Sequence, residues 1–274
     1  MMRLSCLTLS YQNQFKAGKM DIFKFMDTCR SLNFDGIDVH RSALTATDKD
    51  YLKKIRRHAL DCGLTVSAMC VSTEFGRRTD AEIPAEIEKA KESIEIGMML
   101  GAPVLRVFVG SAPSADKTEE AFRRGVDALR KTAELGATYG MPVALQNHSG
   151  LTSTGDDMLK FYKAVNHPNF MLLLDTGHFA GRTGPNGPKI EGTTYADYYR
   201  SIEQVATYAK FVRVKLYELD ANGKERHIDY ARVFNILRGV HYNGFCSLVY
   251  EGKEDELTAI PRGARFLRSF VSAC

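Results

Sequence analysis

Short apolar runs and stretches with helical spacing alternate along the whole chain. The runs are rich in Val, Leu, Ile and Phe and are too short for helices, as is typical of strands buried in a parallel sheet. They lie at residues 3–9, 34–39, 64–71, 103–109, 141–146, 170–175, 210–217 and 245–250. Between them, apolar residues recur at intervals of three and four, which predicts amphipathic helices. These helices are expected at residues 20–32, 48–60, 84–100, 119–135, 156–165, 196–209, 229–240 and 257–271.

Eight strands that alternate with eight helices predict a parallel sheet closed into a (β/α)8 TIM barrel. No low-complexity linker interrupts the pattern, so residues 1–274 are expected to form a single domain. A doubly wound open sheet is the alternative, but the Gly-x-Gly-x-x-Gly turn that usually follows its first strand is missing. On a barrel, active sites form at the carboxyl ends of the strands, so polar residues there are read first.

Composition narrows the class of protein. The 37 Lys and Arg against 33 Asp and Glu give a net charge of +4, spread without a basic block, so neither nucleic acid nor a membrane is indicated as a partner. No apolar run approaches the roughly 18 residues of a membrane helix, and the N-terminus lacks a signal-peptide layout. The six scattered cysteines, without a Cys-x-x-Cys pair, predict reduced core thiols in a cytoplasmic protein.

The predicted strand ends carry a dense set of polar residues. They are Asp38, His40, Glu74, Arg106, Gln146, His148, Asp175, His178, Arg213, Lys215 and Glu251. Arg213 and Lys215 alternate onto one face of a strand, and two cations in a barrel mouth need carboxylate partners or an anionic ligand. The open alternatives are ion pairs with Asp175 and Glu251, or contacts with a substrate carbonyl, carboxylate or phosphate. The remaining histidines, His58, His167, His227 and His241, are expected at the surface without partners.

Several segments, in their order along the chain, resemble those of a known family. FDGIDV, VALQNHSG, LLLDTGH, FVRVKL and the closing IDYARVFNILRGVHYNGFCSLVYEG resemble the xylose-isomerase-like TIM-barrel family. That family includes sugar and sugar-phosphate isomerases and epimerases, inosose dehydratases and AP endonucleases. The resemblance covers nearly the whole chain and implies a sugar or sugar derivative as substrate. It also implies one divalent metal, bound by a Glu, an Asp, a His and a Glu on the last four strands.

Most of those ligand positions are altered in this chain. They fall on Gln146, Asp175, Arg213 and, without a gap, Val249. A guanidinium cannot deprotonate to become a ligand, and its charge opposes a bound cation, so no metal cofactor is favoured. The alternative is one Mn, Mg or Zn ion in a shifted site. Its ligands would be Gln146, His148, Asp175 and Glu251.

The resemblance and the residues together predict an isomerase or epimerase for a sugar or keto-sugar, working by proton transfer through an enediolate. Glu251 or Asp175 is the expected base, His178 the acid that returns the proton, and Lys215 with Arg213 the donors to the enolate oxygen. The expected substrate-binding residues are Gln146, His148, Arg213, Glu74 and Arg106.

Two alternatives stay open. The same enediolate leads to dehydration, so a dehydratase or other lyase is chemically adjacent, and a sugar-binding paralogue without catalysis would keep the barrel and lose the metal. An AP-endonuclease-like nuclease is disfavoured because it needs a cluster of metal ligands and a basic groove. The sequence is also compatible with a homo-oligomer.

Overall fold

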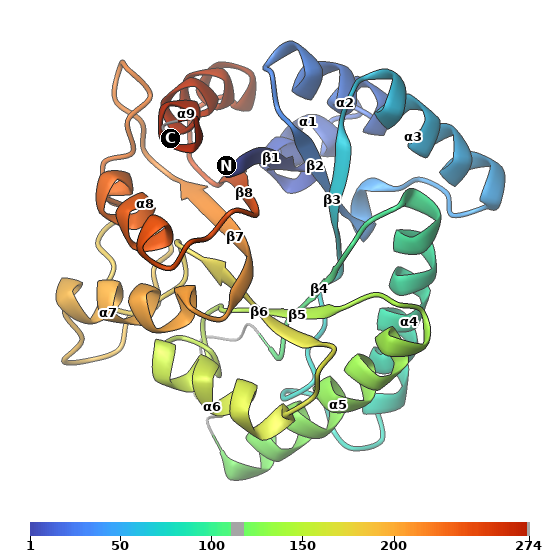
Figure 1. Ribbon diagram of the computed structural model, residues 1–274, viewed down its shortest axis with the longest axis vertical. Coiled ribbons are helices and arrows are strands. Elements are labelled where there is room, and N and C mark those ends of the chain that lie inside the picture. The colour runs from blue at the N-terminus through green and yellow to red at the C-terminus, as the bar shows by residue number, and fades with distance from the viewer. Residues whose placement is uncertain (111–117, 273–274) are drawn as a thin grey trace.

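The computed structural model describes residues 1–110 and 118–272, and over these residues the chain forms a closed barrel (Figure 1). Its strands are β1 (Arg3–Leu7), β2 (Gly36–His40), β3 (Thr65–Cys70), β4 (Leu105–Val107), β5 (Val143–Gln146), β6 (Phe170–Asp175), β7 (Ala209–Leu216) and β8 (Phe245–Tyr250). Each strand pairs in parallel with the next one along the chain, and β8 pairs with β1. The predicted (β/α)8 barrel in one domain is confirmed.

Helices surround the barrel on the outside (Figure 1). They are α1 (Gln12–Lys16), α2 (Ile22–Ser31), α3 (Lys49–Asp61), α4 (Ile83–Leu100), α5 (Glu119–Thr138), α6 (Gly155–Val165), α7 (Tyr195–Ala206), α8 (Tyr230–Gly239) and α9 (Glu256–Val271), with 3-10 helices η1 (Thr8–Tyr11) and η2 (Arg41–Ala43). Short polar side chains accept the first backbone N–H groups, as Asp21 does in α2, Asp48 in α3 and Thr154 in α6.

The start of the chain differs from the prediction. The run at residues 3–9 was expected to be one strand, but β1 ends at Leu7 and the chain then forms η1 and α1. Thr8 turns inward here, where its hydroxyl accepts the backbone N–H of His40 at 3.0 Å. An apolar run gives no sign of where a strand stops when the next turn is buried as well.

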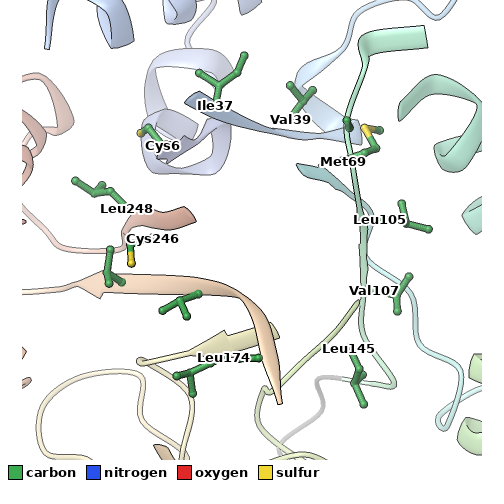
Figure 2. Packing of buried hydrophobic residues seen from close by; sticks show 14 of the residues in the cluster. Cys6, Ile37, Val39, Met69, Leu105, Val107, Leu145, Leu174, Cys246 and Leu248 are labelled. Atoms are coloured by element: carbon green, nitrogen blue, oxygen red, sulfur yellow. The ribbon is translucent and has the colours of Figure 1, made fainter. Parts of the chain in front are cut away.

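Apolar side chains pack on both sides of the sheet. Outward-facing residues such as Ile37, Val39 and Leu105 point away from the barrel axis toward the helices (Figure 2). A smaller cluster belongs to the inside of the barrel, and its members are Leu7, Ala68, Cys70, Val104, Ala144, Leu173, Phe211, Phe245 and Val249. On β5, β6 and β7 a polar residue follows two positions later, namely Gln146, Asp175 and Arg213, so the two ends of the barrel interior differ in chemistry there.

Two predictions from composition can be compared with the described residues. The five cysteines among them, Cys6, Cys29, Cys62, Cys70 and Cys246, are all free and buried, as predicted, while Cys274 lies outside the described residues. Within the same residues, no helix combines the length and the apolar character that crossing a membrane requires.

Candidate active site

The ammonium group of Lys215 lies between two carboxylates at the carboxyl ends of the strands. Its Nζ atom is 2.6 Å from Glu251 Oε1 and 3.5 Å from Asp175 Oδ2. Lys215 belongs to β7, Asp175 is the last residue of β6, and Glu251 directly follows β8. Lys215 and Asp175 are buried, whereas the Glu251 side chain is 32% exposed. Lys215 therefore forms the ion pairs with Asp175 and Glu251 that the sequence left as one alternative. Of these three residues, Glu251 is the one that solvent or a ligand can reach.

The charge of Glu251 is set by Lys215. Burial on its own would raise the pKa of the Glu251 carboxyl, but the Lys215 ammonium and the hydrogen bond between the two outweigh it and lower that pKa below its usual range. Glu251 is therefore a carboxylate at neutral pH. A carboxylate at the mouth, partly exposed and paired with the buried Lys215 ammonium, is a candidate base.

Asp175 is fixed from several directions. Its Oδ2 accepts a hydrogen bond from Gln146 Nε2 at 2.6 Å, and its Oδ1 accepts the backbone N–H of Gly177 at 2.8 Å. The Asn147 side chain accepts the backbone N–H of Asp175 at 2.6 Å and donates to its carbonyl at 2.8 Å. Sequence reasoning missed Asn147. Its only signal was an amide residue between two candidate site residues, which reads equally well as a turn former.

Two imidazoles stack beside this group. The rings of His148 and His178 have centroids 3.9 Å apart and planes inclined by 28°. His178 Nε2 lies 3.9 Å from Asp175 Oδ2 and, within the described residues, is buried without a hydrogen-bond partner. Burial and the Lys215 charge lower the pKa of both rings, that of His148 to about 4. Both imidazoles are therefore neutral at pH 7, which suits His178 to accept or donate a hydrogen bond rather than to act as a charged acid.

Arg213 lies deeper in the barrel than Lys215 and has different partners. It donates from Nη1 to Gln146 Oε1 at 2.8 Å and from Nη2 to Cys70 Sγ at 3.0 Å. The same Nη2 is 3.8 Å from Asp38 Oδ2. Arg213 and Asp175 are register partners on β7 and β6, but the guanidinium contacts Gln146, Cys70 and Asp38. The ion pair with Asp175, one of the two alternatives that the sequence leaves open, is not among its contacts in the described residues.

Arg106 and Glu74 also have protein partners. The Arg106 guanidinium donates to the Val71 carbonyl at 2.9 Å and lies 4.2 Å from the centre of the Phe108 ring. The Glu74 carboxylate pairs with Arg77 at 3.2 Å and with a second arginine, Arg78, at 3.5 Å. These contacts hold Glu74 among rim arginines and do not bring it to Lys215. Their expected roles in substrate binding stay predictions.

The loop that joins β6 to α7 is anchored beside the site where it begins. The buried Arg182 donates from Nε to the Gly177 carbonyl at 2.9 Å, and its guanidinium lies 4.2 Å from the centre of the Tyr217 ring. These contacts fasten the first part of the loop to β7 beside Lys215. The backbone around Gly177 approaches closely, because a Cβ there would lie 2.6 Å from Lys215 Cγ.

Comparison with known proteins agrees with this architecture. Residues 26–270 match the family described as xylose isomerase-like TIM barrel. The chain belongs to this family. It is 26% identical over 183 residues to a 3-dehydroshikimate dehydratase of Bacillus anthracis, and the match covers 65% of this chain and 62% of that relative.

Solved structures of the family share the fold over nearly their whole length. A D-psicose 3-epimerase from Clostridium cellulolyticum H10, solved with D-tagatose, superimposes with a TM-score of 0.77 at 14% identity, and 100% of each chain is covered. The IOLI protein with a bound zinc atom superimposes with a TM-score of 0.79 at 17% identity over 99% of this chain and 98% of that one. At these identities the likeness shows the fold alone.

The zinc in a relative raises the question of whether these residues fit a divalent metal. The carboxylates of Asp175 and Glu251 already share the Lys215 ammonium, and the Gln146 amide donates to Asp175 while it accepts from Arg213. A divalent ion among these donors would lie beside an ammonium and a guanidinium, and repulsion at such distances is worth several kcal/mol. The donor set therefore does not fit the family's metal.

Proposed function

We propose that this protein is a keto-sugar isomerase or epimerase in which the Lys215 ammonium provides the positive charge that stabilises an enediolate. The observation that carries the proposal is the position of Nζ between the Asp175 and Glu251 carboxylates, beside two neutral imidazoles. Such chemistry removes a proton next to a carbonyl, so it needs a base and a fixed electrophile close together. Glu251 and Lys215 are such a pair.

Substrate binding would activate the base. A carbonyl oxygen and a neighbouring hydroxyl that bind Lys215 compete with Glu251 for the ammonium protons. As Lys215 turns toward the substrate, Glu251 loses the contact that lowers its pKa and becomes a stronger base. Asp175 stays paired with Lys215 because Gln146 and Gly177 hold its carboxylate in place.

The proton would then move in two steps. Glu251 takes the proton from the carbon beside the carbonyl, the C–H electron pair forms the carbon–carbon double bond, and the carbonyl oxygen becomes an oxyanion facing Lys215. For the isomer, the proton of the neighbouring hydroxyl passes to the oxyanion, Glu251 returns its proton to the former carbonyl carbon, and the C–O bond of that hydroxyl becomes the new carbonyl. For the epimer, a water molecule on the opposite face protonates the same carbon, and the hydroxide left behind takes the proton held by Glu251. His178 was expected to be the acid that returns the proton. Because its imidazole is neutral and buried, we assign it a hydrogen bond to a substrate oxygen instead.

A related dehydratase is the second candidate, and the similarity to a 3-dehydroshikimate dehydratase favours it. The first half of the reaction is the same. The enediolate then expels a hydroxyl group from the next carbon, with the proton now on Glu251 transferred to the leaving oxygen to form water. An unsaturated ketone is the product, so the two candidates differ in what can be measured.

The test is proton exchange in D2O. The purified protein is incubated with a panel of keto-sugars and cyclic polyhydroxy ketones, with and without a chelator, and followed by NMR and ultraviolet absorbance. Loss of the signal of the proton beside the carbonyl with a new isomer supports the isomerase, and a conjugated ketone supports the dehydratase. Glu251→Gln is expected to abolish both, whereas Lys210→Met, an exposed lysine at the other end of β7, is the matched control.

Two outcomes would overturn the proposal. One is an activity that the chelator abolishes and that added metal restores. The other is sugar binding without proton exchange on any member of the panel, which is the behaviour of a catalytically silent paralogue.

A further inference from the structure

A second group of metal-binding side chains lies between α2 and α3, outside the barrel. Asp27 of α2 accepts a hydrogen bond from His58 Nε2 of α3 at 2.8 Å, and Cys62 Sγ lies 3.6 Å from the same carboxylate oxygen. His58 was expected at the surface without a partner, and it has two, because the Phe23 ring also packs against it with centroids 5.4 Å apart. We propose that Asp27, His58 and Cys62 bind a zinc ion that joins α2 to α3.

The arrangement follows from helix geometry. His58 and Cys62 are four residues apart, at the last turn and the C-cap of α3, so their side chains lie on one face of the helix. Asp27 meets them from α2, the neighbouring helix. The Phe23 and His58 rings pack in a T-shaped arrangement with their planes at 85°, which limits rotation of the imidazole. Each ligand therefore comes from a rigid element rather than from a loop.

The distances suit an ion of the size of zinc. No two of the three ligand atoms are more than 4.8 Å apart. Zinc bonds of about 2.0–2.3 Å at tetrahedral angles place neighbouring ligand atoms roughly 3.3–3.6 Å apart. The Asp27–Cys62 distance of 3.6 Å already suits this, whereas Asp27 and His58, at 2.8 Å, must separate by about half an ångström. The His58 and Cys62 atoms, which are at most 4.8 Å apart, need to approach by no more than about 1.5 Å, with a water molecule as the fourth ligand.

The kinds of donor select the metal. Thiolate, imidazole and carboxylate together are typical of zinc, whereas magnesium and calcium prefer oxygen ligands. The thiolate and the carboxylate would neutralise the two positive charges of the ion. Burial and Asp27 raise the pKa of the Cys62 thiol, and Arg30 acts in the opposite direction, so the metal must displace a proton from sulfur. An ordinary Asp–His ion pair, by contrast, has no need of Cys62.

Cobalt is the probe that reports on this thiol. The full-length protein is freed of metal with a chelator and titrated with Co2+, whose bond to a thiolate gives a charge-transfer band in the near ultraviolet, and Zn2+ is then used to displace it. The expected result is one equivalent of Co2+ with this band and an affinity that rises about tenfold per pH unit, because one proton is released. Zn2+ should also raise the melting temperature.

Variants make the result specific. Cys62→Ser should remove the band and Asp27→Asn should weaken Zn2+ binding by at least about 100-fold, since even outer-shell changes cost 10–100-fold. Asp50→Asn, an exposed change of the same type as Asp27→Asn, should bind as the wild type does, and Asp175→Asn should keep the band because the barrel mouth is not involved. Circular dichroism checks that each variant is folded. Absence of the band in the wild type, its persistence in Cys62→Ser, or equal Zn2+ affinity in Asp27→Asn would overturn the proposal.

Discussion

Two cations of β7, Arg213 and Lys215, lie two residues apart on one face of the strand and belong to different environments. Arg213 is in a deep layer, where Gln146, Cys70 and Asp38 surround its guanidinium and all are buried. Lys215 is in the mouth layer, where one of its two carboxylate partners is partly exposed.

The difference lies in what can replace each partner. The guanidinium partners of Arg213 among the described residues, Gln146, Cys70 and Asp38, are all buried, so none of them is open to exchange with solvent. Lys215 shares its charge between the fixed Asp175 and the accessible Glu251, and a substrate oxygen can take the place of Glu251. We therefore infer that depth along one strand separates the two roles, with Arg213 as the structural cation and Lys215 as the candidate catalytic one.

The largest expected effect is the loss of turnover in Lys215→Met. Without the ammonium, the enediolate oxygen lacks its main stabilising charge, and turnover should fall by about 10²–10³-fold or more, as for a lost oxyanion donor. Lys210→Met, at the exposed amino-terminal end of β7, should leave turnover unchanged. Rates are measured per folded molecule with the substrate found in the D2O panel. A decrease of less than about threefold would remove Lys215 from the mechanism.

Arg213→Met should show the opposite pattern. Removing one member of a buried ionic group leaves Asp38 without its nearest cation, and such losses typically destabilise by about 3–5 kcal/mol. The free energy of unfolding from urea titration should fall accordingly, while turnover per folded molecule stays nearly constant. A large loss of turnover at unchanged stability would instead give Arg213 the role predicted from the sequence, that of a donor to the enolate oxygen.

A gain of metal binding sharpens the comparison further. If Lys215 occupies the place of a metal, replacing it with Met while restoring Gln146→Glu and Arg213→His should create a site with three carboxylates and an imidazole. Tight Mn2+ or Zn2+ binding at this site is the expected result. The double variant that keeps Lys215 is the control and should bind much more weakly. Isothermal titration in a Cys62→Ser background keeps the α2–α3 site out of the measurement, and equal affinities would contradict the role given to Lys215.

The sequence predicted the barrel well because each strand and helix repeats a local pattern that the fold uses directly. The candidate site was harder. The carboxyl ends of parallel strands meet at one end of a barrel, and this brings together Asp175, Lys215 and Glu251. The alternation of side chains along β7 also places Arg213 and Lys215 on one face, but it does not show which carboxylate each of them contacts. That depends on the tilt and curvature of the strands and on side-chain length, which turn Arg213 to Gln146 and Cys70. The position of Glu74 at a strand end does not show its contact with Arg77 in the same loop either, and its role in substrate binding stays a prediction.

The smallest expected effect concerns pH and separates the mouth from the surface. Burial and nearby cations lower the pKa of His178 well below its usual range in the folded protein, whereas in the unfolded chain it returns to about 6.5. Below pH 6.5 the unfolded state therefore binds one more proton at this position than the folded state does. The free energy of unfolding should thus carry no penalty from His178 above pH 6.5, and it should decline as the pH falls below that value.

Each such histidine adds up to about 1.4 kcal/mol per pH unit to the slope of unfolding free energy against pH. His178→Gln should reduce that slope between pH 6.5 and 5 by about this amount, since glutamine binds no proton in either state. His241→Asn, an exposed position whose backbone φ of 56° asparagine tolerates, should leave the slope unchanged. Urea titrations at several pH values measure the three slopes. Equal slopes for His178→Gln and the wild type would mean that His178 takes up its proton over the same pH range in the folded and the unfolded protein, and the role of an acid that donates the proton would then be open to it again.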